Sequence, residues 1–428
     1  MSLVFAGLLF LMILLAKAGM GTLKTPVLVF SIIWCIVGLG ANLCLYEYYA
    51  PSNLVNTIII SGAIIFFIVY GFGLRGVKKS FFTENIKLDS CFINLRILIG
   101  INIVGIVLLL PSLITALIIL RTNELWYIRA NGSEVYSSSL MATLADSVIR
   151  PLFVATTILA IVYLFSDGKQ KTKYVLLMLA IVENIELVIS TAGRAPIVNF
   201  LFYFIIAIVL FRGKSIFELL HHERGKLLFV VALIMGIFVL TQMRSSTNLD
   251  MRDMLETFYN YYFSGPSYLT QLLRNVTEYG IDGRYFWGAA TFGFISNIFS
   301  NILILVTGRP QGTLYIIGSV ITSKQYWVGE HTLLNAMCTG FYPFLLDWGY
   351  LGIVIGPVIL GIITTIITKK VYKNRSLFYI AIYIYWIYAL FRTVFKWDLV
   401  NIDFSVVLIS LYFFTHKCYK VGNDGCRA

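Results

Sequence analysis

The chain consists of long apolar stretches separated by polar connectors. A helix needs about 20 mostly apolar residues to cross the hydrocarbon layer of a membrane. Stretches that reach or approach this length lie at residues 1–16, 26–46, 57–74, 97–120, 148–165, 174–191, 195–211, 227–243, 345–368, 377–394 and 400–416. The pattern predicts an all-α polytopic membrane protein with about eleven transmembrane helices. A signal peptide is the alternative for 1–16, but no basic segment precedes it, which favours an uncleaved helix.

One connector is much longer than the others. Residues 244–343 separate a bundle at 1–243 from the last three helices and a tail at 344–428. Structureless loops of more than about 12–15 residues are usually functional or disordered, and the aromatic content here argues against disorder. We therefore expect a folded cap over the membrane domain. Its aromatic residues, which could rest at the lipid interface or stack on sugar rings, include Tyr259, Tyr261, Tyr262, Phe263, Tyr268, Tyr285, Phe286, Trp287, Tyr326 and Trp327.

The long connector contains an uncharged stretch, Gly288–Val306, that is itself long enough to span a membrane. A single extra crossing would move the basic cluster Lys369–Arg375 to the wrong side, so we expect this stretch to be re-entrant or to lie at the interface. Polar residues recur along it at helical spacing and predict a wetted face. They are Ser296, Asn297, Ser300 and Asn301.

The composition excludes a water-soluble globule. Of the 428 residues, 59% are hydrophobic and 13% are charged, whereas soluble domains carry about 25% charged residues. Alternate connectors carry 21 Lys and Arg residues on one side and 12 on the other, which predicts an external N-terminus, a cytoplasmic C-terminus and an external 244–343 connector. The net charge of +12 does not indicate nucleic-acid binding, because its excess lies in the short inner connectors.

The two sides differ in the kind of basic residue they carry. Ten of the twelve on the predicted outer side are arginine, and fifteen of the 21 on the inner side are lysine. Both satisfy a charge rule equally well, but only the planar guanidinium grips phosphate with two parallel hydrogen bonds. The outer face is therefore predicted to hold an anionic, phosphate-bearing ligand.

Most charges within or beside the predicted helices lie toward their outer ends. Charged side chains are costly in lipid and generally face a bundle interior or an aqueous cavity, so these residues predict an outward-opening polar chamber. Snorkelling and structural ion pairing are the alternatives, above all for Asp146 and Arg150, which are four positions apart. The set comprises Asp146, Arg150, Arg194, Arg244, Asp347, Arg392 and Asp403.

Arg194 stands in the tight outer turn Ser190-Thr191-Ala192-Gly193-Arg194-Ala195-Pro196. The positive end of the following helix dipole would add to the guanidinium charge, an arrangement suited to an anion. Glu183 and Glu186 lie deeper in the preceding helix. We expect them to be buried partners of lysine or arginine, and a proton relay is the alternative.

His331, in Glu330-His331, is the histidine predicted to lie outside. Its imidazole titrates near neutral pH and can accept the proton of a sugar hydroxyl, oriented by Glu330 or a more distant carboxylate. A surface or hydrogen-bonding role is the alternative. The sequence has no Asp-x-Asp, His-Glu-x-x-His, Walker or Gly-x-Ser-x-Gly motif, and its six cysteines show no zinc or disulfide spacing. No metal or other cofactor is expected.

Four motifs carry a resemblance to a known family. They are the Arg194 turn, Met243-Arg244-Ser245-Ser246, Tyr262-Phe263-Ser264-Gly265 and Asp347-Trp348-Gly349-Tyr350-Leu351-Gly352. With them the sequence resembles the Wzy-type polymerases of O-antigen and capsule repeat units, over about residues 180–360 and in the overall helix plan. The resemblance implies a fold related to the membrane-embedded class C glycosyltransferases. It also implies metal-independent transfer of a growing glycan from undecaprenyl diphosphate to the nonreducing end of a lipid-linked repeat unit.

The resemblance also implies roles for individual residues. Arg194 and Arg244 would bind the donor diphosphate, and His331 would be the base, with Asp347 as the alternative base or the group that orients it. By position only, the second-rank diphosphate candidates are Arg284 and Arg309. Arginines could replace both a metal and a general acid, because a diphosphate needs charge stabilisation but no proton when it leaves. The expected partners are undecaprenyl-diphosphate-linked oligosaccharides, membrane lipid, a chain-length regulator and a flippase, at the outer face of the bacterial inner membrane.

Three other functions stay open on the sequence. An O-antigen ligase would share the donor and the long loop but deliver the glycan to lipid A core. A lipid-linked oligosaccharide flippase should show two homologous halves and ionisable residues near the midplane, whereas the sequence shows no internal repeat and its charges are displaced outward. A purely structural partner within an envelope assembly would not require clustered arginines.

Single-cysteine labelling tests the predicted orientation. In a variant without the native cysteines, an impermeant external reagent should modify a cysteine placed at Ser245 but not one placed at Ser215, because the two connectors are predicted to lie on opposite sides. Modification at Ser215 alone would overturn the predicted orientation.

Overall fold

The computed structural model describes residues 1–20, 26–75, 77, 88, 92–122, 127–128, 132–166, 169–212, 251–275, 283–299, 317, 324–335 and 339–416. Within these residues the chain is helical apart from one two-stranded hairpin, which confirms the predicted all-α class. Among the described residues, five segments are long and apolar enough to cross a membrane: Asn53–Gly73, Leu95–Arg121, Ser139–Leu164, Gln170–Thr191 and Tyr342–Asn374. They support a multi-pass membrane protein.

A helix covers each predicted apolar stretch except 227–243, which lies outside the described residues. The helices are α1 (Ser2–Met20), α2 (Ile33–Ala41), α3 (Asn53–Gly73), α5 (Leu95–Thr122), α8 (Arg150–Leu164), α9 (Gln170–Thr191), α10 (Ala195–Arg212), α18 (Gly352–Asn374), α19 (Leu377–Arg392) and α20 (Ile402–Thr415). Short helical segments extend several of them: η1 (Leu28–Ile32), η2 (Leu45–Glu47), η3 (Gly132–Val135), α7 (Ser139–Leu144), η4 (Ala145–Ile149), α17 (Tyr342–Trp348), η6 (Gly349–Leu351) and η7 (Asp398–Val400).

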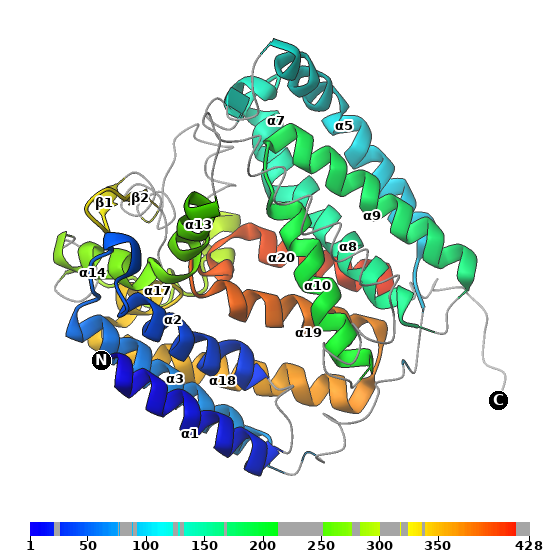
Figure 1. Ribbon diagram of the computed structural model, residues 1–428. Helices are drawn as coiled ribbons and strands as arrows, with labels where there is room; N and C mark the ends of the chain where they lie inside the picture. The colour runs from blue at the N-terminus through cyan, green and yellow to red at the C-terminus, as the bar shows by residue number, and fades with distance from the viewer. Residues whose placement is uncertain are drawn as a thin grey trace, which may run out of the picture.

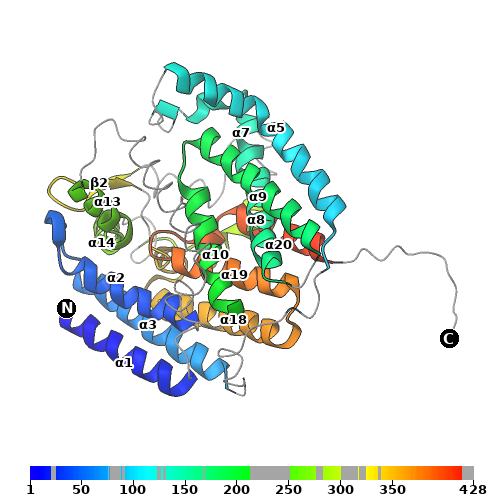
Figure 2. The same cartoon turned by 45° about the vertical axis from the view of Figure 1, so that its right-hand side comes forward.

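The helices form two groups, with α19 and α20 between them (Figures 1 and 2). In one group α1, α2, α3 and α18 pack together, and in the other α8 packs with α9 and α10 while α5 lies along α9. α19 contacts both groups and also α20. Its side chains are mostly buried, and Trp386 donates from Nε1 to Thr364 Oγ1 of α18 over 2.9 Å. α19 is therefore the centre of the core.

α3 and α18 approach each other through small residues. A Cβ atom on Gly361 would lie 2.8 Å from Val69 Cγ1, and one on Gly73 would lie 2.5 Å from Thr365 Oγ1. Helices in a bilayer gain little from the hydrophobic effect on association, so close packing through small residues contributes much of their affinity. The α3–α18 contact has this form.

The connectors predicted to lie outside gather at one end of the bundle, which we call the loop end. The connector between α2 and α3 contacts the long connector there: Tyr49 N donates to Val328 O over 2.8 Å, and Ser267 Oγ donates to Tyr49 O over 2.6 Å. Gly340 N likewise donates to Thr393 O, in the connector after α19. At the opposite end, Asn94 N donates to Phe414 O over 2.7 Å. This packing fits the predicted alternation of sides.

The described part of the long connector forms a small folded unit at the loop end. It contains α13 (Met251–Phe263), α14 (Gly265–Asn275) and a hairpin of β1 (Gln325–Trp327) with β2 (Leu333–Asn335), in which Tyr326 pairs with Leu334. Some of its aromatic residues are core residues: Tyr259 and Tyr268 are buried, whereas Trp287 and Trp327 are exposed.

Residues 293–299 are helical, but the predicted wetted face is wrong at Asn297. This side chain is buried and its Nδ2 donates to Val400 O. Phe294 packs on Phe404 of α20 with ring centroids 5.7 Å apart. The side chain of Asn297 therefore faces another part of the protein, and its amide donates to a backbone carbonyl rather than to water.

Substitution of Gly361 tests the α3–α18 contact. Gly361→Leu should destabilise the protein by about 1–3 kcal/mol, because the new side chain would have to displace Val69. Gly100 of α5 is a matched control, since it is exposed and a Cβ there meets nothing within 4 Å. Thermal unfolding of the detergent-solubilised protein measures both variants. Equal shifts for Gly361→Leu and Gly100→Leu would contradict this packing.

Candidate functional site

The turn that carries Arg194 is built as the sequence predicts. α9 ends at Thr191, whose Oγ1 donates to Leu187 O over 2.7 Å. Ala192 adopts a left-handed conformation with φ +46°, and Val198 N donates to Arg194 O over 3.1 Å as α10 begins. Arg194 is half-buried at the start of α10, where the positive end of the helix dipole reinforces its charge.

Aromatic residues of α13 pack against Arg194. Its Cζ lies 4.5 Å from the centroid of the Tyr261 ring. Burial raises the pKa of Tyr262, and the charge of Arg194 opposes that rise, so this guanidinium lies close to both tyrosines. Stacking on a ring uses the face of a guanidinium, whereas its five N–H groups point outward in its plane. This geometry suits anion binding at the edge of the Arg194 guanidinium while its face stays stacked on the Tyr261 ring.

A second cationic group lies at the end of α19. Asp398 Oδ1 is 3.2 Å from Arg392 Nη1 and 3.5 Å from Lys396 Nζ. Burial raises the pKa of Asp398 to about 6, and the charge of Arg392 opposes that rise. Its other oxygen, Oδ2, is buried and has no hydrogen-bond partner among the described residues. The charge pattern of the sequence predicts a site residue at Arg392 but not at Lys396 or Asp398, although both follow it in a short outer connector.

Packing between α10 and α19 links the two cationic groups. Phe202 lies 4.4 Å from Phe391 between ring centroids, and Tyr388 OH donates to Asn199 Oδ1. The Phe391 ring in turn lies 6.1 Å from that of Tyr262. We call this group the arginine site, defined by Arg194, Tyr261, Tyr262, Arg392, Lys396 and Asp398. Arg194 and Arg392 are thus connected through aromatic side chains of α13 and α19.

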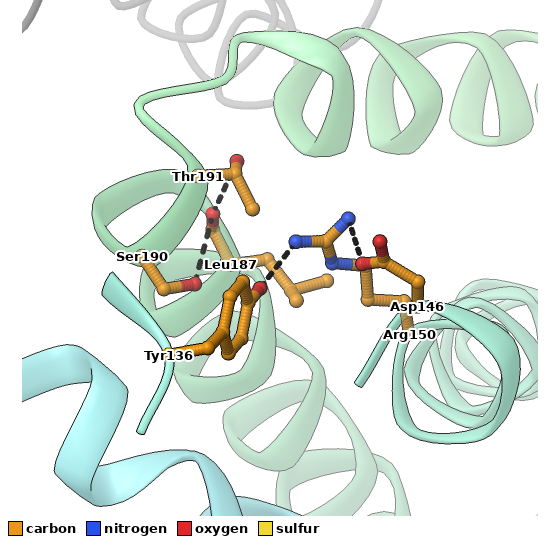
Figure 3. Close-up of polar contacts among 6 residues, drawn as sticks. All are labelled: Tyr136, Asp146, Arg150, Leu187, Ser190 and Thr191. Atoms are coloured by element: carbon orange, nitrogen blue, oxygen red, sulfur yellow. Dashed lines mark hydrogen bonds and ion pairs between the residues drawn. The ribbon is translucent and has the colours of Figure 1, made fainter. Parts of the chain in front are cut away.

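Asp146 and Arg150 form the ion pair that their spacing predicts. Arg150 Nη2 also donates to Tyr136 OH over 2.5 Å. Figure 3 shows the guanidinium between Asp146 and Tyr136, in a view that also includes Leu187, Ser190 and Thr191 of α9. A carboxylate and a phenol already engage this arginine. We therefore assign Arg150 to holding Tyr136 against the η4–α8 helix rather than to ligand binding.

Asp347 is completely buried in α17. Its Oδ1 accepts from Ala290 N over 2.9 Å and its Oδ2 accepts from Thr291 N over 2.6 Å. Trp397 Nε1 donates to Thr291 O over 2.7 Å. Both oxygens thus hold the backbone at residues 290–291. The two roles that the sequence left open for Asp347, as a base or as the group that orients His331, stay predictions.

His331 lies in the turn of the β1–β2 hairpin, and its side chain is 84% exposed. Its Nε2 is 3.5 Å from Oε2 of Glu47, and Glu330 N donates to Glu47 O over 3.2 Å. The more distant carboxylate that sequence reasoning allowed for is therefore Glu47. In Figures 1 and 2 the hairpin lies with α13 and α14, apart from the α9–α10 turn. The structure does not bring His331 beside Arg194.

The same three residues could hold a metal ion. One ligand atom each from Glu47, Glu330 and His331 lies within 4.8 Å of the others. Two carboxylates and an imidazole suit a transition-metal dication such as zinc. All three side chains are exposed, so an ion there would be readily exchanged.

The three remaining predicted diphosphate ligands are Arg284, Arg244 and Arg309. Arg284 is exposed in the 283–299 segment. Arg244 and Arg309 lie outside the described residues.

Comparisons of the chain with protein-family models, with curated proteins and with solved structures find no match. The family resemblance therefore rests on the motifs quoted above, and function has to be argued from the arginine site.

Proposed function

We propose that this protein is a glycosyltransferase that joins undecaprenyl-diphosphate-linked repeat units into O-antigen or capsular polysaccharide. In this proposal about eleven helices span the bacterial inner membrane and the loop end faces outward. The observation that carries it is the stacking of Arg194 on Tyr261 at the loop end, 4.5 Å from the ring centroid. Arg392 and Lys396 share the single carboxylate of Asp398, so this group adds one net positive charge across the Tyr262–Phe391 contact.

The arginine site suits departure of a lipid diphosphate. Negative charge develops on the diphosphate as its bond to the sugar breaks, and preorganised cations stabilise that charge without donating a proton. Arg194 offers paired N–H donors for phosphate oxygens. The exposed Tyr261 ring offers a flat apolar surface beside them on which a sugar ring can rest. Nothing in this scheme requires a metal ion or a nucleotide.

The acceptor hydroxyl needs a base. His331 is our first candidate, with Glu47 in place to orient the imidazole, and its use requires the β1–β2 hairpin to approach the arginine site during the reaction. Asp398 is the alternative, because it already lies beside Arg392 and its pKa is raised to about 6. Such a pKa leaves the carboxylate ionised, and able to accept a proton, near neutral pH.

The reaction can be tested with the purified protein and lipid-linked repeat units. A polymerase should convert single repeats into a ladder of longer lipid-linked glycans without any lipid A core. An O-antigen ligase would leave the repeats unchanged until lipid A core is added. Unchanged repeats under both conditions would exclude both the polymerase and the ligase function.

In this assay Arg194→Lys should lower the rate about a hundredfold or more, because lysine keeps the charge but loses the fork that aligns the diphosphate. Arg274→Lys is a matched control, since Arg274 is an exposed arginine of α14 at the same end of the protein. A normal rate for a folded Arg194→Lys protein would show that simple charge neutralisation suffices.

His331→Ala should lower the polymerisation rate on the order of a hundredfold if the imidazole is the base. Added zinc should inhibit the wild-type protein, because the ion would engage the imidazole together with Glu47 and Glu330. A chelator should leave the untreated enzyme unchanged. Full activity of His331→Ala, with a large loss in Asp398→Asn, would move the base role to the arginine site.

A further inference from the structure

Two carboxyl groups lie buried in α9, away from the arginine site. Glu183 is 0% exposed and Glu186 is 3% exposed. All four of their oxygens are buried, and none has a hydrogen-bond partner among the described residues. The two residues are three positions apart on one helix, a spacing that places their side chains next to each other.

No lysine or arginine among the described residues forms an ion pair with either glutamate, contrary to our expectation from the sequence. Arg150 of the neighbouring helix is held by Asp146 and Tyr136 (Figure 3). The glutamates therefore have to be neutralised by something other than a basic side chain.

An unpaired buried carboxylate costs several kcal/mol or more, and two adjacent carboxylates also repel each other. Full protonation does not remove the difficulty, because each neutral carboxyl group has an O–H donor that needs an acceptor. One cation placed between the two groups lowers the net charge of the pair from −2 to −1, removes their mutual repulsion and gives both groups a shared partner. A shared proton gives a hydrogen bond from one carboxyl to the other, and Na⁺ would be bound by oxygens of both.

Polar residues surround this level of the helix group. Asn184 Nδ2 donates to Thr157 Oγ1 of α8 over 2.8 Å, and Thr156 Oγ1 donates to Asn102 Oδ1 of α5 over 3.2 Å. These bonds join α5, α8 and α9 in one polar layer between otherwise apolar helices. Ionisable residues inside membrane bundles commonly mark ion or proton pathways, and this layer places Glu183 and Glu186 in such a setting.

We propose that Glu183 and Glu186 form a binding site for one monovalent cation, a proton or Na⁺, shared between the two carboxyl groups. The pair titrates as a unit rather than as two independent acids. A magnesium ion is a poorer fit, since it demands octahedral coordination and gives up its water shell reluctantly. The site does not involve the diphosphate or the acceptor, and so it goes beyond the proposed transferase activity.

Labelling with a hydrophobic carbodiimide tests this site, because the reagent modifies protonated carboxyl groups in apolar surroundings. The full-length protein in liposomes is treated with dicyclohexylcarbodiimide, and peptide mass spectrometry locates the adduct. We expect an adduct on Glu183 or Glu186 in mildly acidic buffer. Its rate of formation should fall about tenfold per pH unit once the pH exceeds the apparent pKa of the pair. No glycan substrate is needed, so this test succeeds or fails independently of the polymerase assay.

Sodium at constant ionic strength, with choline as the replacement, identifies the cation. Slower labelling in sodium supports a Na⁺ site, and labelling that depends on pH alone supports a proton site. The adduct should be lost in the double variant Glu183→Gln with Glu186→Gln, and retained in Glu134→Gln, where the carboxyl removed is exposed. Absence of an adduct on both glutamates of the wild-type protein in acid would overturn the proposal. So would labelling that changes with neither pH nor sodium.

Discussion

The loop end of this protein depends on the buried carboxylate of Asp347. Both of its oxygens accept backbone N–H groups, from Ala290 and Thr291. Thr291 O in turn accepts the indole N–H of Trp397. Buried backbone donors and acceptors have to be paired, and these bonds pair them with α17 on one side and the α19–α20 connector on the other. These hydrogen bonds fix the position of segment 283–299 over the helix ends.

That position has consequences for the arginine site. The connector held by Trp397 also carries Lys396 and Asp398, so its cations and its carboxylate are placed by the same contacts. Tyr261 and Tyr262 come from α13, and Arg194 comes from the α9–α10 turn. Each functional side chain comes from the end of a rigid helix or a tight turn. Cations held in this way need little reorganisation when charge develops on a ligand.

The charged groups near the outer end of α9 differ in their partners from those deeper in the helix. At the loop end, the two terminal nitrogens of Arg150, in the neighbouring helix, contact Asp146 and Tyr136 (Figure 3). Deeper in α9, Glu183 and Glu186 are fully enclosed and their oxygens have no partner among the described residues. Water can reach charged groups at a helix end but not those in the interior. The deeper pair therefore calls for a bound cation, whereas the outer carboxylate and guanidinium pair with each other.

Local patterns in the sequence were sufficient for the helices and for the shortest-range contacts. The apolar stretches predicted helices because a bilayer requires each segment to satisfy its own backbone. The 192–194 turn and the Asp146–Arg150 pair followed from spacing along one or two helical turns. The face of Asn297 was predicted wrongly, because a polar stripe does not reveal whether water or another part of the protein covers it.

The partners of the functional side chains were decided only by the tertiary structure. The sequence singled out Arg194, His331 and Asp347, but their contacts are Tyr261, Glu47 and the backbone at residues 290–291. Each contact joins segments that lie far apart along the chain. No local periodicity encodes such a pairing, since it depends on how the connectors fold against the helix ends. The sequence by itself thus determined which residues are costly to place in a membrane, and the packing of the loop end determined which of them meet.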